Sequence, residues 1–411
     1  MLKRRIAITG LGALTGAGEG ALPLWQSAVE GRSAIGTLSF SANGNGWHPA
    51  GAEIRDFIPE KFVTQRKALK VMARDIQLAV AAASLAIDDA KLRTVSVPRE
   101  RMGLIVGSGV LNHELDELAY SIQSSVSDKG LLDLKKFGTD GISALFPLWL
   151  LKYLPNMPAC HISILFDLQG PNNTMTTGAS SALQAIGEAV RIIERGAADL
   201  MLAGGAESKT NPLGLSQYQV MGVLSDSYKP FDKDAKGFVI GEGAGFIVLE
   251  EWEHAKKRGA KIYAEVTGFG ASSSKGRFEA MDSALAESGI LAKELSYIQS
   301  SGVGIPEEDR LELEAIEALT KTGPAVALTN SKPVTGFTGF AAGVLDVIVS
   351  TLALEHQIIP PMLNLKNLRG ASGAQWILDR SGKKEIRYVL TNAFGLGSPC
   401  ASLVTKRFEG K

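Results

Sequence analysis

Apolar residues along the chain follow two patterns, short continuous runs and longer stretches with helical spacing. The short runs lie at residues 5–9, 103–110, 198–208 and 387–398, and most of them lead into glycine, which predicts buried strands. Apolar residues recur every three or four positions at 68–91 and 308–320, which predicts amphipathic helices. The pattern favours an α/β fold in which helices cover the strands.

The chain also carries an internal repeat. RRIAITGLGALT (4–15) is echoed by KIYAEVTGFGASS (261–273), and GLIVGSGV (103–110) by YIQSSGVG (297–304). MTTGASSALQAIGEAVRII (175–193) is echoed by VTGFTGFAAGVLDVIVSTL (334–352), and ADLMLAGGAES (198–208) by RYVLTNAFGLGS (387–398). Duplicated βαβαβ halves predict an α-β-α-β-α five-layer sandwich, with halves at 1–255 and 256–411 and an insertion at about 111–155.

The stretch GLGALTGAG after the first predicted strand is interpreted as a glycine-rich loop. It resembles a dinucleotide-binding motif only in part, because its third glycine comes one residue late. No acidic residue follows at about 20 positions further on to complete that motif. The sequence therefore does not predict a nucleotide cofactor.

Composition narrows the class of protein. The 411 residues include 43 basic and 43 acidic ones, so no net charge attracts nucleic acid or an anionic membrane. Two cysteines cannot build a disulfide framework or a cysteine-rich metal site. The N-terminus lacks the apolar core of a signal peptide, and no apolar run reaches about 18 residues. We expect a soluble, cytoplasmic protein without a metal.

The stretch MTTGASSALQAIGEAV at 175–190 predicts a sharp turn from a strand into a helix. Many enzymes hold a nucleophile at such a turn, because the bend exposes one side chain beside free helix N–H groups. The residue at the apex is Ala179, whose methyl group offers no chemistry. The sequence thus predicts the support for a nucleophile without the nucleophile.

Longer motifs resemble the decarboxylating β-ketoacyl synthases, which have the thiolase fold. The segment PFDKDAKGFVIGEGAGFIVLEEWEHAKKRGAKIYAEVTGFG (230–270) is similar to the elongating synthases almost residue for residue. LQGPNN (168–173), LAGGAES (202–208) and NAFGLGS (392–398) resemble the same family. The resemblance covers nearly the whole chain and implies the five-layer thiolase fold.

The resemblance also implies which positions carry the family's chemistry. The family's nucleophilic cysteine corresponds to Ala179, and its two histidines correspond to Ser301 and Phe337. The aromatic gate of its closing motif corresponds to Leu396. The supporting residues are kept, as Asp309, Glu312 and Lys332. Loss of a covalent nucleophile and of both imidazoles removes powers of ten in rate, so we expect no condensation by this chain.

An intact fold with an emptied site resembles the chain length factor, the ketosynthase-like β subunit of type II polyketide synthases. This implies a heterodimer with a catalytic ketosynthase α subunit, with a higher heteromer left open, joined at the edge strand 174–177. The partner would condense malonyl units delivered by acyl carrier protein. Phosphopantetheine would be carried by that protein, and no cofactor of this chain is expected. Many chain length factors carry Gln where this chain has Ala179.

Several residues are candidates for the interface tunnel that would limit product length. Val110 matches the position that closes the family's acyl pocket, and Trp149 matches an aromatic residue that enters the partner's pocket. Leu111, Leu115 and Leu118 have helical spacing and either line the tunnel or pack in the core. The basic cluster on 66–74 either docks acyl carrier protein or is a solvated helix face; its members are Arg66, Lys67, Lys70 and Arg74.

Other reactive residue types are interpreted as structural. Cys160 and His161 are adjacent in sequence, so their side chains point apart and cannot form a nucleophile–base pair. Ser180 and Ser181 are expected to cap the helix after the turn. Cys400 is expected to be buried, and the helical residues His254 and His356 are expected at the surface.

Two alternatives remain open at this stage. The chain could decarboxylate malonyl-carrier substrates or have another thiolase-fold activity, with Ser301 and Lys332 in place of the imidazoles. It could also be a scaffold that docks carrier protein without holding a growing chain. The length of the product, and whether it is a polyketone or a polyene, do not follow from the sequence.

Overall fold

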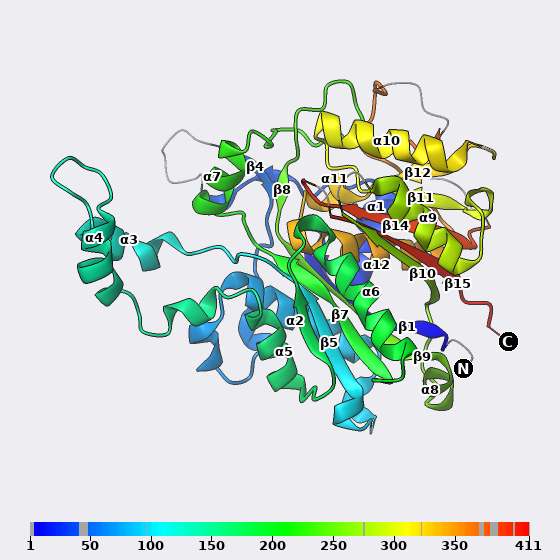
Figure 1. The fold of residues 1–411 in the computed structure, drawn as a ribbon, viewed down its shortest axis with the longest axis horizontal. Coiled ribbons are helices and arrows are strands. Elements are labelled where there is room, and N and C mark those ends of the chain that lie inside the picture. The colour runs from blue at the N-terminus through cyan, green and yellow to red at the C-terminus, as the bar shows by residue number, and fades with distance from the viewer. Residues whose placement is uncertain are drawn as a thin grey trace.

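The fold is known from a computed structural model that describes residues 4–40, 48–95, 97–273, 276–321, 323–369, 374–378, 385–397 and 399–410. It has five layers, in which two groups of strands alternate with three layers of helices (Figure 1). The predicted α-β-α-β-α sandwich is confirmed. The predicted domain boundary between residues 255 and 256 stays a prediction.

The two halves contain strands in the same order. In the first half the order is β6-β5-β7-β9-β1, with bounds Asn172–Met175, Met102–Gly107, Leu200–Glu207, Gly243–Glu251 and Ile6–Thr15. In the second half the order is β12-β11-β14-β15-β10, with bounds Ala327–Thr329, Tyr297–Gln299, Tyr388–Phe394, Cys400–Arg407 and Ala264–Ser272. Each pair of echoed sequence segments therefore occupies equivalent places.

The halves meet where β1 pairs antiparallel with β10, from Ile6 opposite Val266 to Ile8 opposite Ala264. This pairing makes one hydrogen-bonded path of eleven strands, which ends at β13 (Gln375–Trp376) and at β6. β2 (Gly18–Glu19) pairs with β1, and a small separate sheet contains β3 (Gly36–Thr37), β4 (Ala50–Ala52) and β8 (Ile240–Gly241).

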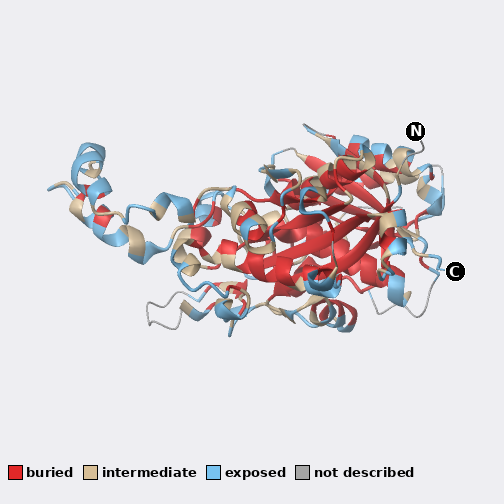
Figure 2. Cartoon of the chain, turned by 90° about the horizontal axis from the view of Figure 1, so that it is seen from below, coloured by how far each residue is buried: buried red, intermediate tan, exposed pale blue. Residues whose placement is uncertain are grey.

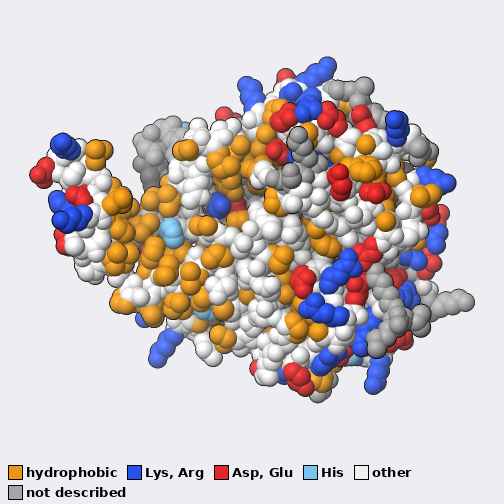
Figure 3. Space-filling view, viewed as in Figure 1, with side chains coloured by type: hydrophobic (Ala, Val, Ile, Leu, Met, Phe, Trp, Pro, Cys, Tyr) orange, Lys and Arg blue, Asp and Glu red, His pale blue; other side chains and the backbone are white. Residues whose placement is uncertain are grey.

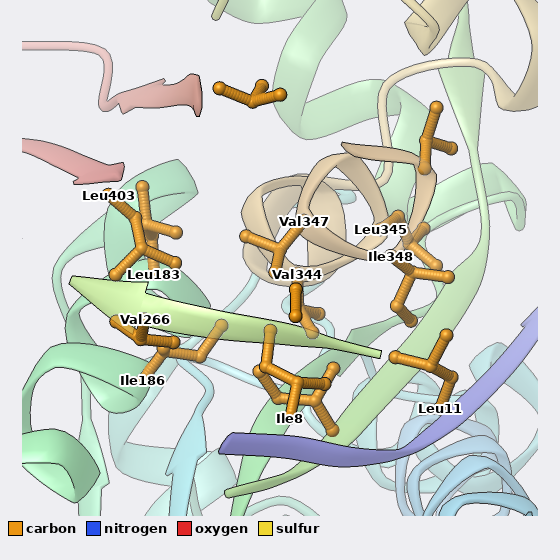
Figure 4. Packing of buried hydrophobic residues seen from close by; sticks show 14 of the residues in the cluster. Ile8, Leu11, Leu183, Ile186, Val266, Val344, Leu345, Val347, Ile348 and Leu403 are labelled. Atoms are coloured by element: carbon orange, nitrogen blue, oxygen red, sulfur yellow. The ribbon is translucent and has the colours of Figure 1, made fainter. Parts of the chain in front are cut away.

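The inner layer consists of α6 (Ser181–Glu194) and α12 (Ala342–His356). Leu183 and Ile186 of α6 and Val344 and Val347 of α12 pack into one apolar cluster with strand residues of both halves, including Ile8, Val266 and Leu403 (Figure 4). This cluster holds the two halves together by burying apolar surface from both.

The outer layers cover the opposite faces of the strands. α2 (Arg74–Asp89) and α5 (Met157–Phe166) cover the first half, and α9 (Arg277–Ser288) and α10 (Pro306–Thr320) cover the second. Along β5, Leu104 and Val106 pack toward α2 whereas Ile105 packs inward. Both faces of the strand are buried, which is why its sequence is a continuous apolar run.

The remaining helices lie around these layers. Their bounds are Ala21–Glu30 (α1), Leu115–Ser124 (α3), Leu134–Lys136 (α4), Pro212–Val220 (α7), Trp252–Lys257 (α8) and Lys332–Thr335 (α11). Three short 3₁₀ helices matter for the site: Trp149–Lys152 (η7), Gly178–Ser180 (η8) and Gly339–Ala341 (η10).

Paired glycines explain a difference from the sequence prediction. The strand expected at 5–9 continues to Thr15 as β1, so Gly10 and Gly12 lie in a strand and not in a loop. A Cβ atom at Gly12 would lie 2.1 Å from the carbonyl oxygen of Ala82 on α2. In the second half, a Cβ atom at Gly270 would lie 2.1 Å from the carbonyl oxygen of Ala280 on α9. Glycine lets helix and strand backbones approach closely at both places.

One helical segment differs from the expectation that no apolar run reaches about 18 residues. Among the described residues, the 18-residue segment Gly339–His356 is long and apolar enough to span a membrane, with mean hydropathy 1.3. In the structure 83% of it is buried, because it lies between the two sheets. Its apolar character is accounted for by this central position.

The predicted insertion, residues 111–155, extends away from the rest of the molecule (Figures 1 and 2). We call it the arm; it contains α3 and α4. The arm exposes many large apolar side chains, and the view in Figure 3 shows apolar side chains gathered over it and its base. Examples are Tyr120, Leu131, Leu134, Ile142, Phe146 and Leu150. Such a patch is typical of a surface that binds another protein.

Candidate functional site

The strand-to-helix turn predicted at 175–190 is present. β6 ends at Met175, Gly178 has φ 67° in η8, and α6 begins at Ser181. The Thr177 N–H donates to Ser181 Oγ over 2.8 Å, and Ser180 Oγ donates to the Thr177 carbonyl over 2.9 Å. Both serine residues are buried, and their hydroxyls bond Thr177 within the turn. The expectation that they cap α6 is wrong, because no side-chain hydrogen bond caps the start of that helix.

Ala179 lies at the apex of the turn and is 9% exposed. It belongs to an apolar cluster that contains Phe337, Phe238 and Val303, with Leu396 packed against it. The Phe337 ring is 2% exposed and lies 4.4 Å from the Phe238 ring, centroid to centroid. Ala179 and Phe337, the residues that the sequence analysis assigned to the cysteine and the second histidine, therefore lie in one apolar cluster.

Ser301 is buried beside this cluster, and its groups are already bonded. Its Oγ accepts a hydrogen bond from the Phe394 N–H over 2.9 Å. The N–H groups of Ser301 and Gly302 donate to the two carboxylate oxygens of Glu312, each over 2.8 Å. The carboxylate thus fixes the backbone at the first histidine position.

Asp309, one turn earlier on helix α10, also binds backbone N–H groups. Its carboxylate accepts hydrogen bonds from the N–H groups of Phe231 over 2.7 Å and Gly304 over 3.0 Å. Burial raises the pKa of Asp309 to about 7, against the lowering effect of these bonds, and burial also raises the pKa of Glu312. Both carboxylates therefore bind backbone N–H groups, although their burial disfavours the ionised form.

Lys332 begins α11 and is almost fully buried. Its Nζ donates to the Ser300 carbonyl over 3.0 Å and forms an ion pair with Asp346 of α12. Asp346 also accepts hydrogen bonds from Gln299 over 3.0 Å and Ser331 over 2.8 Å. The sequence analysis missed Asp346, although it is the only charged residue in the apolar stretch 342–354, and that isolation was a usable signal.

The tunnel candidates separate into two groups. Val110 is 67% exposed directly after β5, and Leu115 is exposed on α3, so both face away from the core of this chain. Leu111 is buried in the cluster under α2, in agreement with the core alternative, and Leu118 is half-buried. Leu396 is half-buried against the cluster around Ala179.

Trp149 packs within its own chain. Its ring stacks on His113 at 4.9 Å and lies 5.2 Å from Tyr153. These contacts leave the Trp149 ring half-buried in this chain, and the expectation that it enters a partner's pocket stays a prediction. Tyr153 is fixed there by a hydrogen bond from its hydroxyl to Glu117 over 2.7 Å.

The basic cluster is smaller than predicted. Arg66, Lys67 and Lys70 are exposed, as expected for either docking or a solvated face. Arg74 is not part of that surface, because it pairs with Glu242 at 2.7 Å and donates to the Ile54 carbonyl. Glu242 is 0% exposed, and a buried carboxylate requires such a partner.

Outcomes for the other reactive residue types are mixed. Cys160 and His161 are half-buried neighbours on α5, and Cys400 is buried with its pKa raised to about 11 by desolvation. His356 is exposed and stacks on Trp25 at 5.4 Å. His254 is not a free surface residue, because its Nδ1 lies 2.5 Å from the buried carboxylate of Glu250.

Among the residues that the structure describes, no three His, Cys, Asp or Glu side chains are grouped so that they could hold a metal ion. The chemistry available at the turn is therefore that of its protein groups. A methyl, a bonded serine and a phenyl ring supply neither a nucleophile nor a free acid or base.

Comparison with known proteins identifies the family. The beta-ketoacyl synthase N-terminal domain matches residues 3–255, and the C-terminal domain of the same synthases matches 257–366. The 3-oxoacyl-[acyl-carrier-protein] synthase 2 of Vibrio cholerae is 33% identical, over 99% of this chain and 100% of its own length. The chain belongs to the β-ketoacyl synthase family.

Solved structures agree with this assignment. A beta-ketoacyl synthase from Burkholderia phymatum superposes with a TM-score of 0.87 at 26% identity, over 99% of this chain and 100% of the other. The structure described as the ishigamide ketosynthase/chain length factor superposes with a TM-score of 0.83 at 27% identity, with the same coverage.

Proposed function

We propose that this chain is a non-catalytic chain length factor that acts in a complex with a cysteine-containing β-ketoacyl synthase. The proposal rests on the resemblance that assigns the family's nucleophile and imidazoles to Ala179, Ser301 and Phe337. It is supported by the burial of all three residues and by the packing of Ala179 and Phe337 in one apolar cluster. A methyl group cannot form a thioester, and a phenyl ring cannot stabilise an enolate by hydrogen bonding.

The reaction would take place in the partner. A cysteine there would receive the growing chain, and malonyl units would arrive on acyl carrier protein, which would also bring phosphopantetheine. This chain would supply one wall of the tunnel at the interface and limit product length. We place this complex in the cytoplasm and assign the chain no cofactor and no metal of its own.

Two surfaces support a protein partner. The arm exposes large apolar side chains, and within the described part of the chain β6 pairs with β5 alone, so its other edge is open. An open edge strand can pair with a strand of another chain, and the apolar arm would add buried area. Two copies of this chain would bring no cysteine to the turn, which favours a different subunit as partner. The related ketosynthase/chain length factor structure is consistent with such a pair.

The bonding at the site argues against a decarboxylase. Ser301 Oγ accepts from Phe394, and Lys332 is engaged by Asp346 and the Ser300 carbonyl. Lys332 is thus held in the interior by Asp346, and the Ser301 hydroxyl would be a single donor for the enolate oxygen where the family has two imidazoles. Release of CO₂ from malonyl-carrier by the isolated chain, abolished by Ser301→Ala, would support the decarboxylase instead.

The proposal is tested by expressing the chain alone and together with a ketosynthase from the same operon. We expect a stable complex with that ketosynthase, product formation only in the complex, and no acyl label on this chain. A homodimer that neither binds the ketosynthase nor changes product length would contradict the proposal. A docking scaffold would bind the partner, yet substitutions along the tunnel wall, such as Trp149→Ala, would leave the products unchanged.

A further inference from the structure

A row of aromatic side chains leads from the emptied turn toward the base of the arm. Phe337 packs on Phe238 at 4.4 Å, and Phe238 meets the edge of Tyr218 at 5.1 Å. Lys209 Nζ then lies 5.1 Å from the ring centroids of both Tyr218 and Phe340. We call Phe337, Phe238, Tyr218 and Phe340 the aromatic row.

Phe340 stands at the outer end of this row. Its ring abuts the backbone just after β5, since a Cβ atom at Gly109 would lie 2.0 Å from the Cζ atom of Phe340. The ring is half-buried, and the next residue along the chain from Gly109 is the exposed Val110. Phe340 therefore occupies the space between the interior of the site and the surface where the arm begins.

The buried carboxylate of Glu207 fixes the backbone at Phe340. The Phe340 N–H donates to Glu207 over 3.1 Å, and the same carboxylate accepts from the Tyr218 hydroxyl over 2.9 Å. Gly339 has φ 46°, and a Cβ atom there would lie 2.1 Å from the carboxylate, so glycine allows Glu207 to approach η10. One buried carboxylate thus binds both the backbone of Phe340 and the hydroxyl of Tyr218.

We infer that Phe340 is a length-determining residue: its ring closes this subunit's side of an apolar passage that would otherwise accept the end of the growing acyl chain. The inference rests on the proposed function for its substrate, an apolar acyl chain bound to the partner. The closure itself rests on the contacts of Phe340 with Gly109, Glu207 and Lys209. With the ring in place, a chain that enters at Val110 stops there.

The experiment uses the complex of this chain with its ketosynthase and compares the wild type with Phe340→Ala and Phe340→Leu. Phe408→Ala is the matched control, because that ring is also half-buried but packs on Trp252 at 5.7 Å, away from the aromatic row. Crystals under xenon should show the gas between Gly109 and Tyr218 in Phe340→Ala only. Products of Phe340→Ala should be longer by at least one two-carbon unit, with Phe340→Leu intermediate and Phe408→Ala unchanged.

The outcomes separate the two proposals. A Phe340→Ala complex that folds but binds no xenon would overturn the inference, since the ring would not have filled a passage. Xenon binding with unchanged products would overturn the role in length determination. Failure of the wild-type chain to bind any cysteine-containing ketosynthase would instead contradict the proposed function, and the length claim would fall with it.

Discussion

Two neighbouring regions of this molecule differ in whether their buried side chains are charged. The support network, defined as Asp309, Glu312, Lys332 and Asp346, keeps its charges although it is buried. The aromatic row beside it contains no charge at all. Three of the four network residues bond backbone groups of the site directly, and the fourth neutralises Lys332.

The difference shows which part of a catalytic site the fold depends on. The network satisfies backbone N–H and C=O groups that would otherwise be buried without partners, so its loss would cost stability. A nucleophile or a catalytic imidazole has to keep its reactive atoms free, so the backbone does not depend on it. Such groups can be replaced by methyl and phenyl groups that pack well.

The largest effect is expected from breaking the network at Lys332. Lys332→Met leaves Asp346 buried without its cation, which costs about 3–5 kcal/mol in the free energy of unfolding. Urea denaturation measures this loss, and the double variant with Asp346→Leu should recover much of it. The control is Lys261→Met, because Lys261 pairs with Glu355 at the surface and should contribute less than about 1 kcal/mol. Equal losses in the two single variants would contradict the comparison.

A second buried carboxylate extends the comparison to the first half of the fold. Asp75 on α2 accepts a hydrogen bond from the Ser208 N–H over 2.7 Å, and burial raises its pKa from 3.8 to about 7. An acid whose pKa is raised in the folded state favours folding when protonated. Its contribution is therefore present below about pH 4 and is lost as the pH rises to about 7.

Asp75→Asn removes this titration and keeps an acceptor for Ser208. We expect the stability of the variant relative to wild type to rise between about pH 4 and pH 7, by up to roughly 4 kcal/mol at about 1.4 kcal/mol per pKa unit. Denaturation at a series of pH values measures the difference. A difference that stays flat over this range would show that Asp75 is ionised without penalty.

The aromatic row is tested by replacing one of its phenyl rings with an imidazole. Phe337→His places a polar ring against Phe238 inside an apolar cluster, which costs about 1–3 kcal/mol. We expect no release of CO₂ from malonyl-carrier, because Ala179 and Ser301 remain. Phe337→Leu is the matched apolar control and should cost less than about 1.5 kcal/mol. Turnover by Phe337→His alone would show that one lost imidazole had silenced the site.

Much of the architecture could be predicted from sequence because it rests on local patterns. The repeat predicted the two halves, and the turn motif placed Ala179 correctly. It did not predict that Ser180 and Ser181 bond Thr177 within the turn and leave α6 without a side-chain cap. Contacts between distant segments could not be predicted in the same way. Arg74 looked like a surface charge until its partner Glu242, 168 residues away, was placed beside it. Phe340 carries no motif, and only the fold brings it against Gly109.

The smallest effect on stability is expected from the exposed basic residues. The triple variant Arg66→Glu, Lys67→Glu and Lys70→Glu should unfold within about 0.5 kcal/mol of wild type, because these side chains lie in water. If they attract an acidic carrier protein, its affinity for the complex should fall several-fold at low salt, and added salt should shrink the difference. Surface plasmon resonance measures the affinity and its salt dependence. The matched charge control is the triple variant Lys256→Glu, Lys257→Glu and Lys293→Glu, whose side chains are also exposed. An equal loss in the control would reflect net charge alone and would assign the cluster to a solvated helix face.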